Sequence, residues 1–136
     1  MYPEGQHLLL IDNDAERRQL CEEILLDAGF AVTAVADSIS AIRAASSCRF
    51  ALAVIAMVLP GTLDGPATIR RIRAAQPLLK ALFTGTVVQR PFLRGRDRDE
   101  FIPSPFRRRD FLGCVFELLH REVAPLSEAW SERRAG

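Results

Sequence analysis

The sequence predicts a doubly wound α/β domain with five parallel strands, and three observations lead to this class. Short, nearly continuous apolar runs alternate with segments of helical periodicity along most of the 136 residues. Such runs suit strands that are covered on both faces of a parallel sheet. Right-handed crossovers between alternating strands and helices leave few other arrangements. Nearly half of the residues are apolar, which is enough for one core.

The first strand–helix unit shows the pattern most clearly. We expect a strand over His7–Ile11, ended by an acidic turn at residues 12–14. A helix begins at Asp14, and Gly29 stands where a left-handed residue would end it. Its apolar positions recur at four-residue spacing: Leu20, Ile24 and Ala28.

The same alternation continues to residue 123. Further strands are expected at Phe30–Val35, Phe50–Ala56, Leu79–Thr84 and Phe101–Pro103. Further helices are expected over Ser38–Ser46, from Pro66 to before Pro77 with Ile69 and Ile72 inward, and over about Arg107–Val123. The last helix has an apolar stripe of Phe111, Val115, Leu118 and Leu119.

Two segments fit the alternation poorly. A helix is expected between the fourth and fifth strands, but Pro91 and Gly95 interrupt that segment, so the helix should be irregular, shortened or displaced. We therefore expect a lead-in over residues 1–6, one domain over 7–123 and a tail over 124–136, in which Trp130 is the main apolar residue.

Composition and charge exclude several classes of protein. The net charge is +1, so no overall field directs the protein to nucleic acid or to a membrane. No apolar run is long enough to span a bilayer, and the start lacks the pattern of a secretion signal. Three widely spaced cysteines suggest neither a disulfide framework nor a zinc site. We expect a cytoplasmic protein.

Ligand sites of open α/β sheets form beyond the carboxyl ends of the strands. The residues that arrive there are Asp12, Asn13, Ala56, Thr84 and Ser104. With the segments "LIDND", "VIAMVLPGTLDG", "FTG" and "FIPSPF" in this order, the sequence resembles the receiver domain of bacterial two-component response regulators. The resemblance implies a flavodoxin-like fold with strand order 2-1-3-4-5.

The resemblance also implies a role for each position. Asp12 matches the first acid of the family's metal-binding pair, and Asn13 stands where the second acid belongs. Ala56 falls where the family has its phosphoacceptor aspartate, and Ser104 replaces the family's lysine. Thr84 matches the hydroxyl that contacts the phosphoryl group.

The substitutions weaken the chemistry that the family performs. Mg²⁺ prefers carboxylate oxygens, and phosphoryl transfer needs a nucleophile and a balancing cation. Ala56 supplies no nucleophile and Ser104 no cation. We therefore expect no enzymatic activity, no cofactor and no bound Mg²⁺. Phe101 matches the aromatic switch of the family, although core packing is the explanation we favour for it.

An arginine-rich segment is the candidate partner-binding region. Residues 90–109 hold seven arginines against three acids: Arg90, Arg94, Arg96, Arg98, Arg107, Arg108 and Arg109. Arginine pairs well with carboxylates and phosphates. In receivers this face docks partners or dimerises, so a homodimer through the fourth-helix segment, fifth strand and last helix is possible. A solvated basic surface is the simpler alternative.

We interpret the chain as a stand-alone, atypical pseudo-receiver that acts by phosphorylation-independent protein–protein interaction in two-component signal transduction. Its expected partner is a histidine kinase, a phosphotransfer protein or another regulator of a phosphorelay. Two alternatives remain open. The first is nucleic-acid binding through residues 90–109, which the near-zero net charge and the missing recognition motif disfavour. The second is a small ligand in the vacated pocket.

Overall fold

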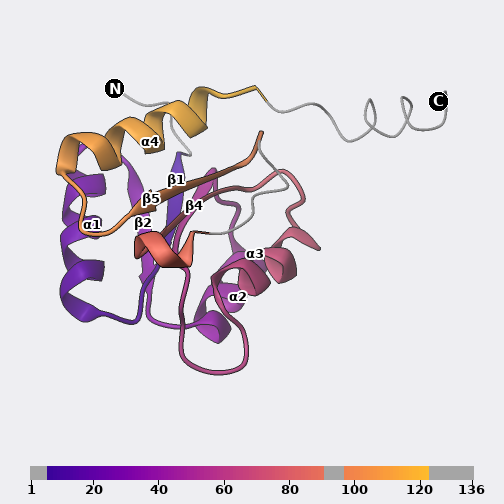
Figure 1. Ribbon diagram of the computed structural model, residues 1–136. Helices are drawn as coiled ribbons and strands as arrows, with labels where there is room; N and C mark the ends of the chain where they lie inside the picture. The colour runs from indigo at the N-terminus through magenta and orange to yellow at the C-terminus, as the bar shows by residue number, and fades with distance from the viewer. Residues whose placement is uncertain (1–5, 91–96, 123–136) are drawn as a thin grey trace, which may run out of the picture.

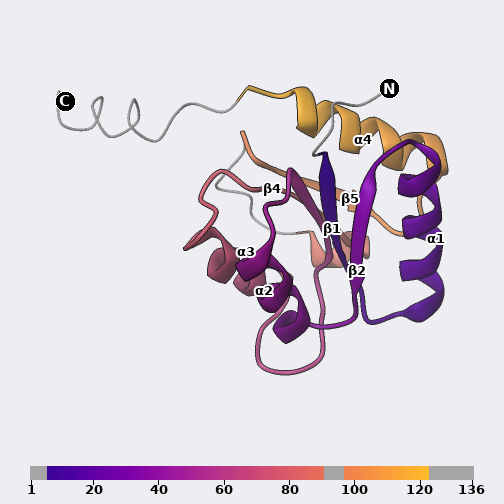
Figure 2. The same cartoon turned by 180° about the vertical axis from the view of Figure 1, so that it is seen from behind.

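The computed structural model describes residues 6–90 and 97–122, in which a five-stranded sheet lies between two pairs of helices (Figures 1 and 2). The strands are β1 (His7–Ile11), β2 (Ala31–Val35), β3 (Leu52–Ala56), β4 (Lys80–Gly85) and β5 (Asp99–Pro103). All neighbouring strands are parallel, and their order is β2-β1-β3-β4-β5. The predicted fold class and strand order are therefore confirmed.

Within the described ranges, four α-helices cover the sheet, two on each face. They are α1 (Ala15–Asp27), α2 (Ser38–Ser47), α3 (Gly65–Arg73) and α4 (Arg108–His120). Helices α1 and α4 pack on one face, and α2 and α3 pack on the other, as both views of the ribbon show (Figures 1 and 2). None of the helices within the described residues is long and apolar enough to cross a membrane.

Aspartate side chains start three of these helices. Asp14, Asp37 and Asp64 each accept a hydrogen bond from the backbone N–H three residues later, at 2.8–2.9 Å. Such caps satisfy backbone donors that have no partner within the helix. The predicted end of α1 is also confirmed, because Gly29 has a φ of 100°.

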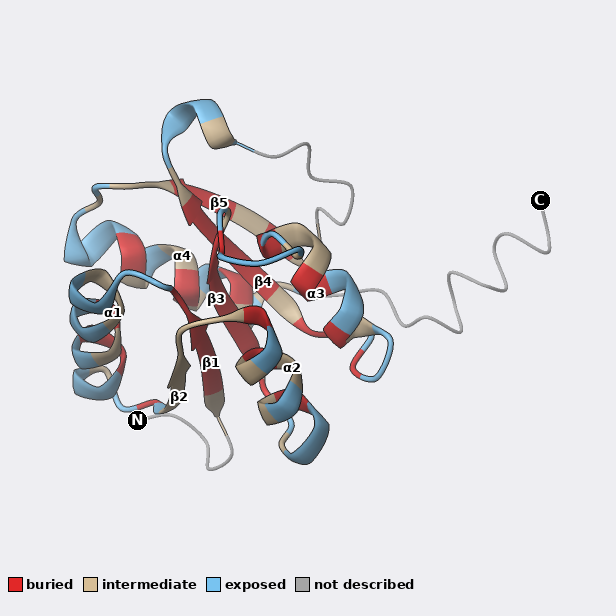
Figure 3. Ribbon diagram, turned by 90° about the horizontal axis from the view of Figure 1, so that it is seen from below, coloured by how far each residue is buried: buried red, intermediate tan, exposed pale blue. Residues whose placement is uncertain are grey.

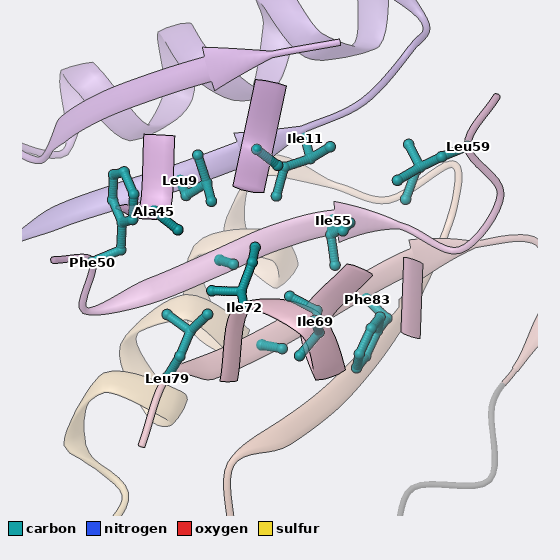
Figure 4. Close-up of a cluster of buried hydrophobic side chains, with 14 of the residues drawn as sticks. Leu9, Ile11, Ala45, Phe50, Ile55, Leu59, Ile69, Ile72, Leu79 and Phe83 are labelled. Atoms are coloured by element: carbon teal, nitrogen blue, oxygen red, sulfur yellow. The ribbon is translucent and has the colours of Figure 1, made fainter. Parts of the chain in front are cut away.

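The core alternates along the strands because successive side chains point to opposite faces of a sheet. Leu9, Ile55 and Phe83 face α2 and α3, in the cluster of Figure 4. Leu10 and Val54 face α1 and α4. The central strands are buried on both sides, whereas the outer helix surfaces are exposed (Figure 3). This burial explains why the strands read as continuous apolar runs.

The inward face of α1 differs from the prediction. Ile24 of the predicted stripe is buried and Ala28 packs against the core, but Leu20 is 55% exposed, and Cys21 and Leu25 complete the inward face. Residues at positions i, i+3 and i+4 share one helix face, and a shift of one position turns a side chain by about 100°. A four-residue spacing drifts around the helix by about 40° per step, so Leu20 falls outside the inward face on which Ile24 lies.

Several element boundaries also differ: β3 starts at Leu52 and not at Phe50, and α4 ends at His120 and not at Val123. Helix α3 ends at Arg73, before the expected stop at Pro77, and β5 starts at Asp99, two residues early. Between β4 and β5 the described residues hold a short 3₁₀ helix, η1 (Val87–Gln89), in line with an irregular fourth helix. Arg94, Arg96, Trp130 and the tail lie outside the described residues.

Candidate functional site at the carboxyl edge of the sheet

Strand register brings the expected site residues together. Ile11 pairs with Ile55, so Asp12 and Ala56 follow side by side at the ends of β1 and β3. Ala56 pairs with Thr84 of β4, and Thr84 pairs with Ile102 of β5. The site positions that the family resemblance implies at the ends of these strands therefore meet at the carboxyl edge of the sheet.

A cavity of about 260 Å³ opens at this edge. Its lining includes the expected Asn13, Ala56, Thr84 and Ser104, together with Arg17 and a group of residues from the two strand-end loops: Met57, Val58, Gly85, Thr86 and Gln89. No aspartate or glutamate belongs to this lining, which consists of described residues. Ala56 belongs to this lining and is 4% exposed, so the site has an alanine where a reactive side chain would be needed.

The loop after β3 folds back on the strand end. Met57 N–H donates to the carbonyl oxygen of Thr84 at 2.8 Å, and Gly65 N–H donates to that of Met57 at 2.9 Å. Asp64 is engaged as the cap of α3, where it accepts from Ala67 N–H at 2.8 Å. This cap gives the Asp64 carboxylate a structural role.

Asp12 is the one acid of the expected site, and it is buried with both carboxylate oxygens engaged. Arg17 Nε donates to Oδ2 at 2.5 Å and Arg17 Nη2 donates to Oδ1 at 2.8 Å. Oδ1 also accepts from Asp14 N–H at 2.9 Å, and Arg18 Nη1 donates to the Asp12 carbonyl oxygen at 2.8 Å. The Asp12 carboxylate is therefore held by one guanidinium and one backbone N–H, and a second guanidinium binds its carbonyl oxygen.

The two residues that follow Asp12, Asn13 and Asp14, are exposed, whereas Asp12 itself is buried. Asn13 is exposed at the cavity rim. Asp14 caps α1, and the hydrogen bond from Arg17 N–H lowers the pKa of its carboxyl, with the nearby arginine charges acting in the same direction. In the acidic turn, Asp14 therefore caps α1 and Asp12 forms a buried ion pair.

Arg17 was not predicted as a site residue. It is the third residue of α1, and its side chain turns back toward the end of β1. Its spacing from Asp12 is the available sequence signal: an arginine in the first turn of a helix can reach an acid that ends the preceding strand. Only the structure shows that it does so in preference to Arg18.

The remaining site residues come from β4 and β5. Thr84 is 4% exposed and lines the cavity. Ser104 precedes a cis peptide bond to Pro105, and its N–H donates to the Gly85 carbonyl oxygen at 2.7 Å. Phe101 is buried in the core that faces α2 and α3. The Arg90 guanidinium lies 4.8 Å from the centroid of the Phe101 ring, a cation–π contact.

The described arginines of residues 90–109 occupy separate places. Arg90 lies on Phe101, whereas Arg98 donates to the Pro77 carbonyl oxygen at 2.7 Å next to the start of β5. Arg107, Arg108 and Arg109 are exposed at the start of α4, where Arg108 lies 3.7 Å from Asp27 of α1. Partner binding through these arginines stays a prediction, and the exposed triplet is the compact group among those described.

Mg²⁺ is the cofactor that the resemblance implies, and the donor set does not fit it. No group of three or more His, Cys, Asp or Glu side chains that could hold a metal ion occurs within residues 6–90 and 97–122. The two oxygens of Asp12 already bind a guanidinium, and Ala56 adds no ligand. Mg²⁺ needs six oxygen ligands in near-ideal octahedral geometry, commonly with one or two carboxylates.

Comparison with known proteins places this site in a family context. No protein-family model matches the chain. PetR of Rhodobacter capsulatus is 32% identical over 117 residues, which are 85% of this chain and 49% of PetR. The transcriptional regulatory protein TctD of Salmonella typhimurium is 30% identical over 124 residues, 89% of this chain and 55% of TctD. The chain thus spans about half the length of these curated relatives.

Solved structures give the same picture over the whole domain. A response regulator receiver protein from Sinorhizobium medicae is 26% identical with a TM-score of 0.73, covering 88% of this chain and 98% of that one. The receiver domain of a sensor histidine kinase from Pseudomonas aeruginosa, which has a magnesium ion in its active-site cleft, is 25% identical with a TM-score of 0.70, covering 85% and 98%. Fold, strand order and sequence similarity together identify the chain as a receiver domain of the CheY-like response regulator family.

Proposed function

We propose that this receiver domain signals through protein contact without being phosphorylated. The observation that carries the proposal is the buried methyl group of Ala56 between Asp12 and Thr84, at the position where the family resemblance puts the phosphoacceptor. Phosphoryl transfer to a receiver requires a carboxylate nucleophile at this point. An alanine cannot accept the group, and it adds no negative charge that would imitate the phosphorylated state.

The surroundings support the same reading. The cavity lining has no carboxylate to replace the missing one, and Ser104 brings no cation to balance a phosphoryl group. Asp64 on the neighbouring loop offers no better acceptor, because its carboxylate caps α3. The scaffold is intact while its acceptor chemistry is missing, which favours a role in binding.

The first experiment tests phosphorylation directly. The protein is incubated with radiolabelled acetyl phosphate and Mg²⁺ beside a receiver domain that has its acceptor aspartate. We expect label on the control only. A hydroxylamine-sensitive label approaching one phosphoryl group per molecule of this protein, mapped to an aspartate, would contradict the proposal.

The second experiment tests binding. The exposed Arg107, Arg108 and Arg109 at the start of α4 are the proposed contact for an acidic surface on a histidine kinase, phosphotransfer protein or regulator. Changing all three to alanine should abolish capture of the cognate partner by the immobilised protein. The matched control removes an equal charge from exposed arginines of α2 and α3: Arg43, Arg70 and Arg71. Equal loss in both variants would show that only net charge matters.

A small polar ligand is a second candidate, because the cavity of about 260 Å³ presents the Arg17 side chain and the Thr84 hydroxyl. This volume lies at the small end of ligand pockets, so only a small molecule would fit. Amide chemical shifts around residues 56–58 and 84–86 are followed during titration with acetate, phosphate and acetyl phosphate. Saturable shifts that the variant Ala56→Leu abolishes would support it.

A further inference from the structure

We propose that the guanidinium of Arg17 is the resident cation of this site and takes the place of the divalent metal ion on Asp12. The inference concerns the ion pair alone and does not depend on whether the chain is phosphorylated. It rests on the geometry of one buried carboxylate and one side chain that turns back to it from α1.

The contact is bidentate and charge-assisted. Arg17 donates through Nε and Nη2 to the two different oxygens of Asp12, at 2.5 and 2.8 Å. Two parallel N–H···O bonds match the fork of a guanidinium to a carboxylate, which a single point charge cannot do. The Asp12 side chain is 4% exposed and that of Arg17 36%, so the carboxylate is shielded while the guanidinium remains at the cavity wall.

A buried carboxylate needs a counter-charge, and this chain supplies it internally. Burying an ionised carboxylate without a partner is strongly unfavourable. Arg17 provides the positive charge, and Asp14 N–H adds a third hydrogen bond to Oδ1. Asp12 thus has its charge and much of its hydrogen-bonding capacity satisfied without any ion from solution.

A divalent ion would have to break this arrangement. It would displace two charge-assisted hydrogen bonds and leave two positive charges beside the released guanidinium. Ala56 offers no oxygen to compensate, and Asn13 is a neutral, exposed amide. Divalent cations bind through oxygen ligands, of which carboxylates are the strongest here. The native site is therefore insensitive to Mg²⁺.

The first test uses the native protein. Its thermal midpoint is measured in MgCl₂ and in EDTA at matched ionic strength, and Mn²⁺ is titrated while amide line widths of residues 12–14 and 56–58 are recorded. We expect equal midpoints and no saturable broadening at these residues. A rise of the midpoint with Mg²⁺, together with saturable broadening at residue 12, would overturn the proposal.

The second test restores a carboxylate and then removes the competitor. Mn²⁺ affinity is compared in Ala56→Asp, in Ala56→Asp with Arg17→Gln, and in Ala56→Asp with Arg18→Gln. Arg18 is a close control, because it carries the same charge one residue away but donates to the Asp12 carbonyl instead of the carboxylate.

We expect the Arg17→Gln double variant to bind Mn²⁺ about tenfold more tightly, or better, than the other two, the scale on which neighbouring groups change metal affinity. Equal affinities in the two double variants would show that only local charge matters and would overturn the proposal. Circular dichroism verifies folding. If the double variant does not fold, the Mg²⁺ and Mn²⁺ measurements on the native protein decide whether Arg17 takes the place of the metal ion. Labelling by acetyl phosphate is measured separately, so the proposal on Arg17 and the proposed function can fail independently.

Discussion

The backbone of Gly65 lies directly against the carbonyl oxygen of Ala56. A Cβ on Gly65 would stand 2.3 Å from that oxygen, which is closer than real Cβ atoms come to a neighbouring atom. The first residue of α3 thus approaches the end of β3 without a side chain between them, and the hydrogen bond from Gly65 N–H to Met57 closes the loop. This close approach holds the start of α3 against Ala56, which lines the cavity.

Gly65→Ala should destabilise the fold, by about 2 kcal/mol as for an overpacked site. The new methyl group meets backbone, which cannot turn aside as a flexible side chain would. Urea unfolding measures the change in the free energy of unfolding. Gly113→Ala in α4 is the control, because its Cβ would meet nothing within 4 Å. That variant should be more stable, by about 0.5–1 kcal/mol. Similar losses in both would show that contact with Ala56 is not the cause.

The side chain of Gln76 connects the end of α2 to the segment before β3. Gln76 is only 8% exposed, so these contacts are buried. Its Nε2 donates to the carbonyl oxygens of Ala45 and Cys48 at 2.8 and 2.9 Å, and its Oε1 accepts from Phe50 N–H at 3.2 Å. Gln76→Met keeps the length but leaves these backbone groups without partners. We expect a loss of about 2–4 kcal/mol by urea unfolding, since each unsatisfied buried group costs about 1–3 kcal/mol.

The exposed Gln19 provides the control for this substitution. Its side chain reaches only Glu23, at 3.2 Å on the surface of α1. Gln19→Met should change the free energy of unfolding by less than about 0.5 kcal/mol. If the loss of stability at Gln76 is no larger than at Gln19, the hydrogen bonds of the Gln76 side chain do not stabilise the fold.

Asp37, the cap of α2, should make stability depend on acid pH. The hydrogen bond from Ser40 N–H lowers the pKa of its carboxyl below 3.8. A lowered folded-state pKa means that the stabilisation is present above the unfolded value and disappears as pH falls through the folded value. Asp37→Ala should therefore be less stable than the native protein at neutral pH, and the difference should shrink below pH 3.8.

Asp37→Asn separates charge from capping, because asparagine also caps helices well. At neutral pH we expect the stability of Asp37→Asn to lie between those of the native protein and Asp37→Ala. Its stability should not show the loss at acid pH that protonation of Asp37 causes. Thermal unfolding between neutral pH and the acid limit of folding measures all three proteins. A difference between native and Asp37→Ala that stays constant with pH would exclude the ionised cap as its source.

The sequence allowed the sheet to be predicted because strands buried on both faces are unmistakable as apolar runs, as in Leu52–Ala56. It also placed Asp12, Ala56 and Thr84 at one edge, since parallel strands end together. It did not reveal Arg17, because a side chain that bends back across a turn leaves no periodic trace. The four-residue spacing placed Ile24 correctly in the core but not Leu20, because such a spacing drifts around the helix and its ends can leave the buried face.

The early start of β5 has a cause that periodicity also misses. Strand propensity disfavours an aspartate, but Asp99 pairs with Ala81 and its side chain, 10% exposed, meets Arg73 of α3. Arg73 Nη2 donates to Asp99 Oδ1 at 2.6 Å, and Nε and Nη2 donate to the Leu79 carbonyl oxygen at 2.9 and 2.7 Å. A long-range ion pair thus gives the buried aspartate at the first position of this strand its counter-charge.

Arg73→Met should therefore be costly, because it leaves the Asp99 carboxylate buried without its counter-charge. The expected loss is about 3 kcal/mol by urea unfolding, at the lower end for a broken buried pair because both side chains keep some exposure. Arg70→Met on the exposed side of α3 is the matched control and should be nearly neutral. Adding Asp99→Leu to Arg73→Met should recover part of the loss, because no unpaired charge then remains. If the second substitution recovers nothing, the cost belongs to the Leu79 contacts and not to the ion pair.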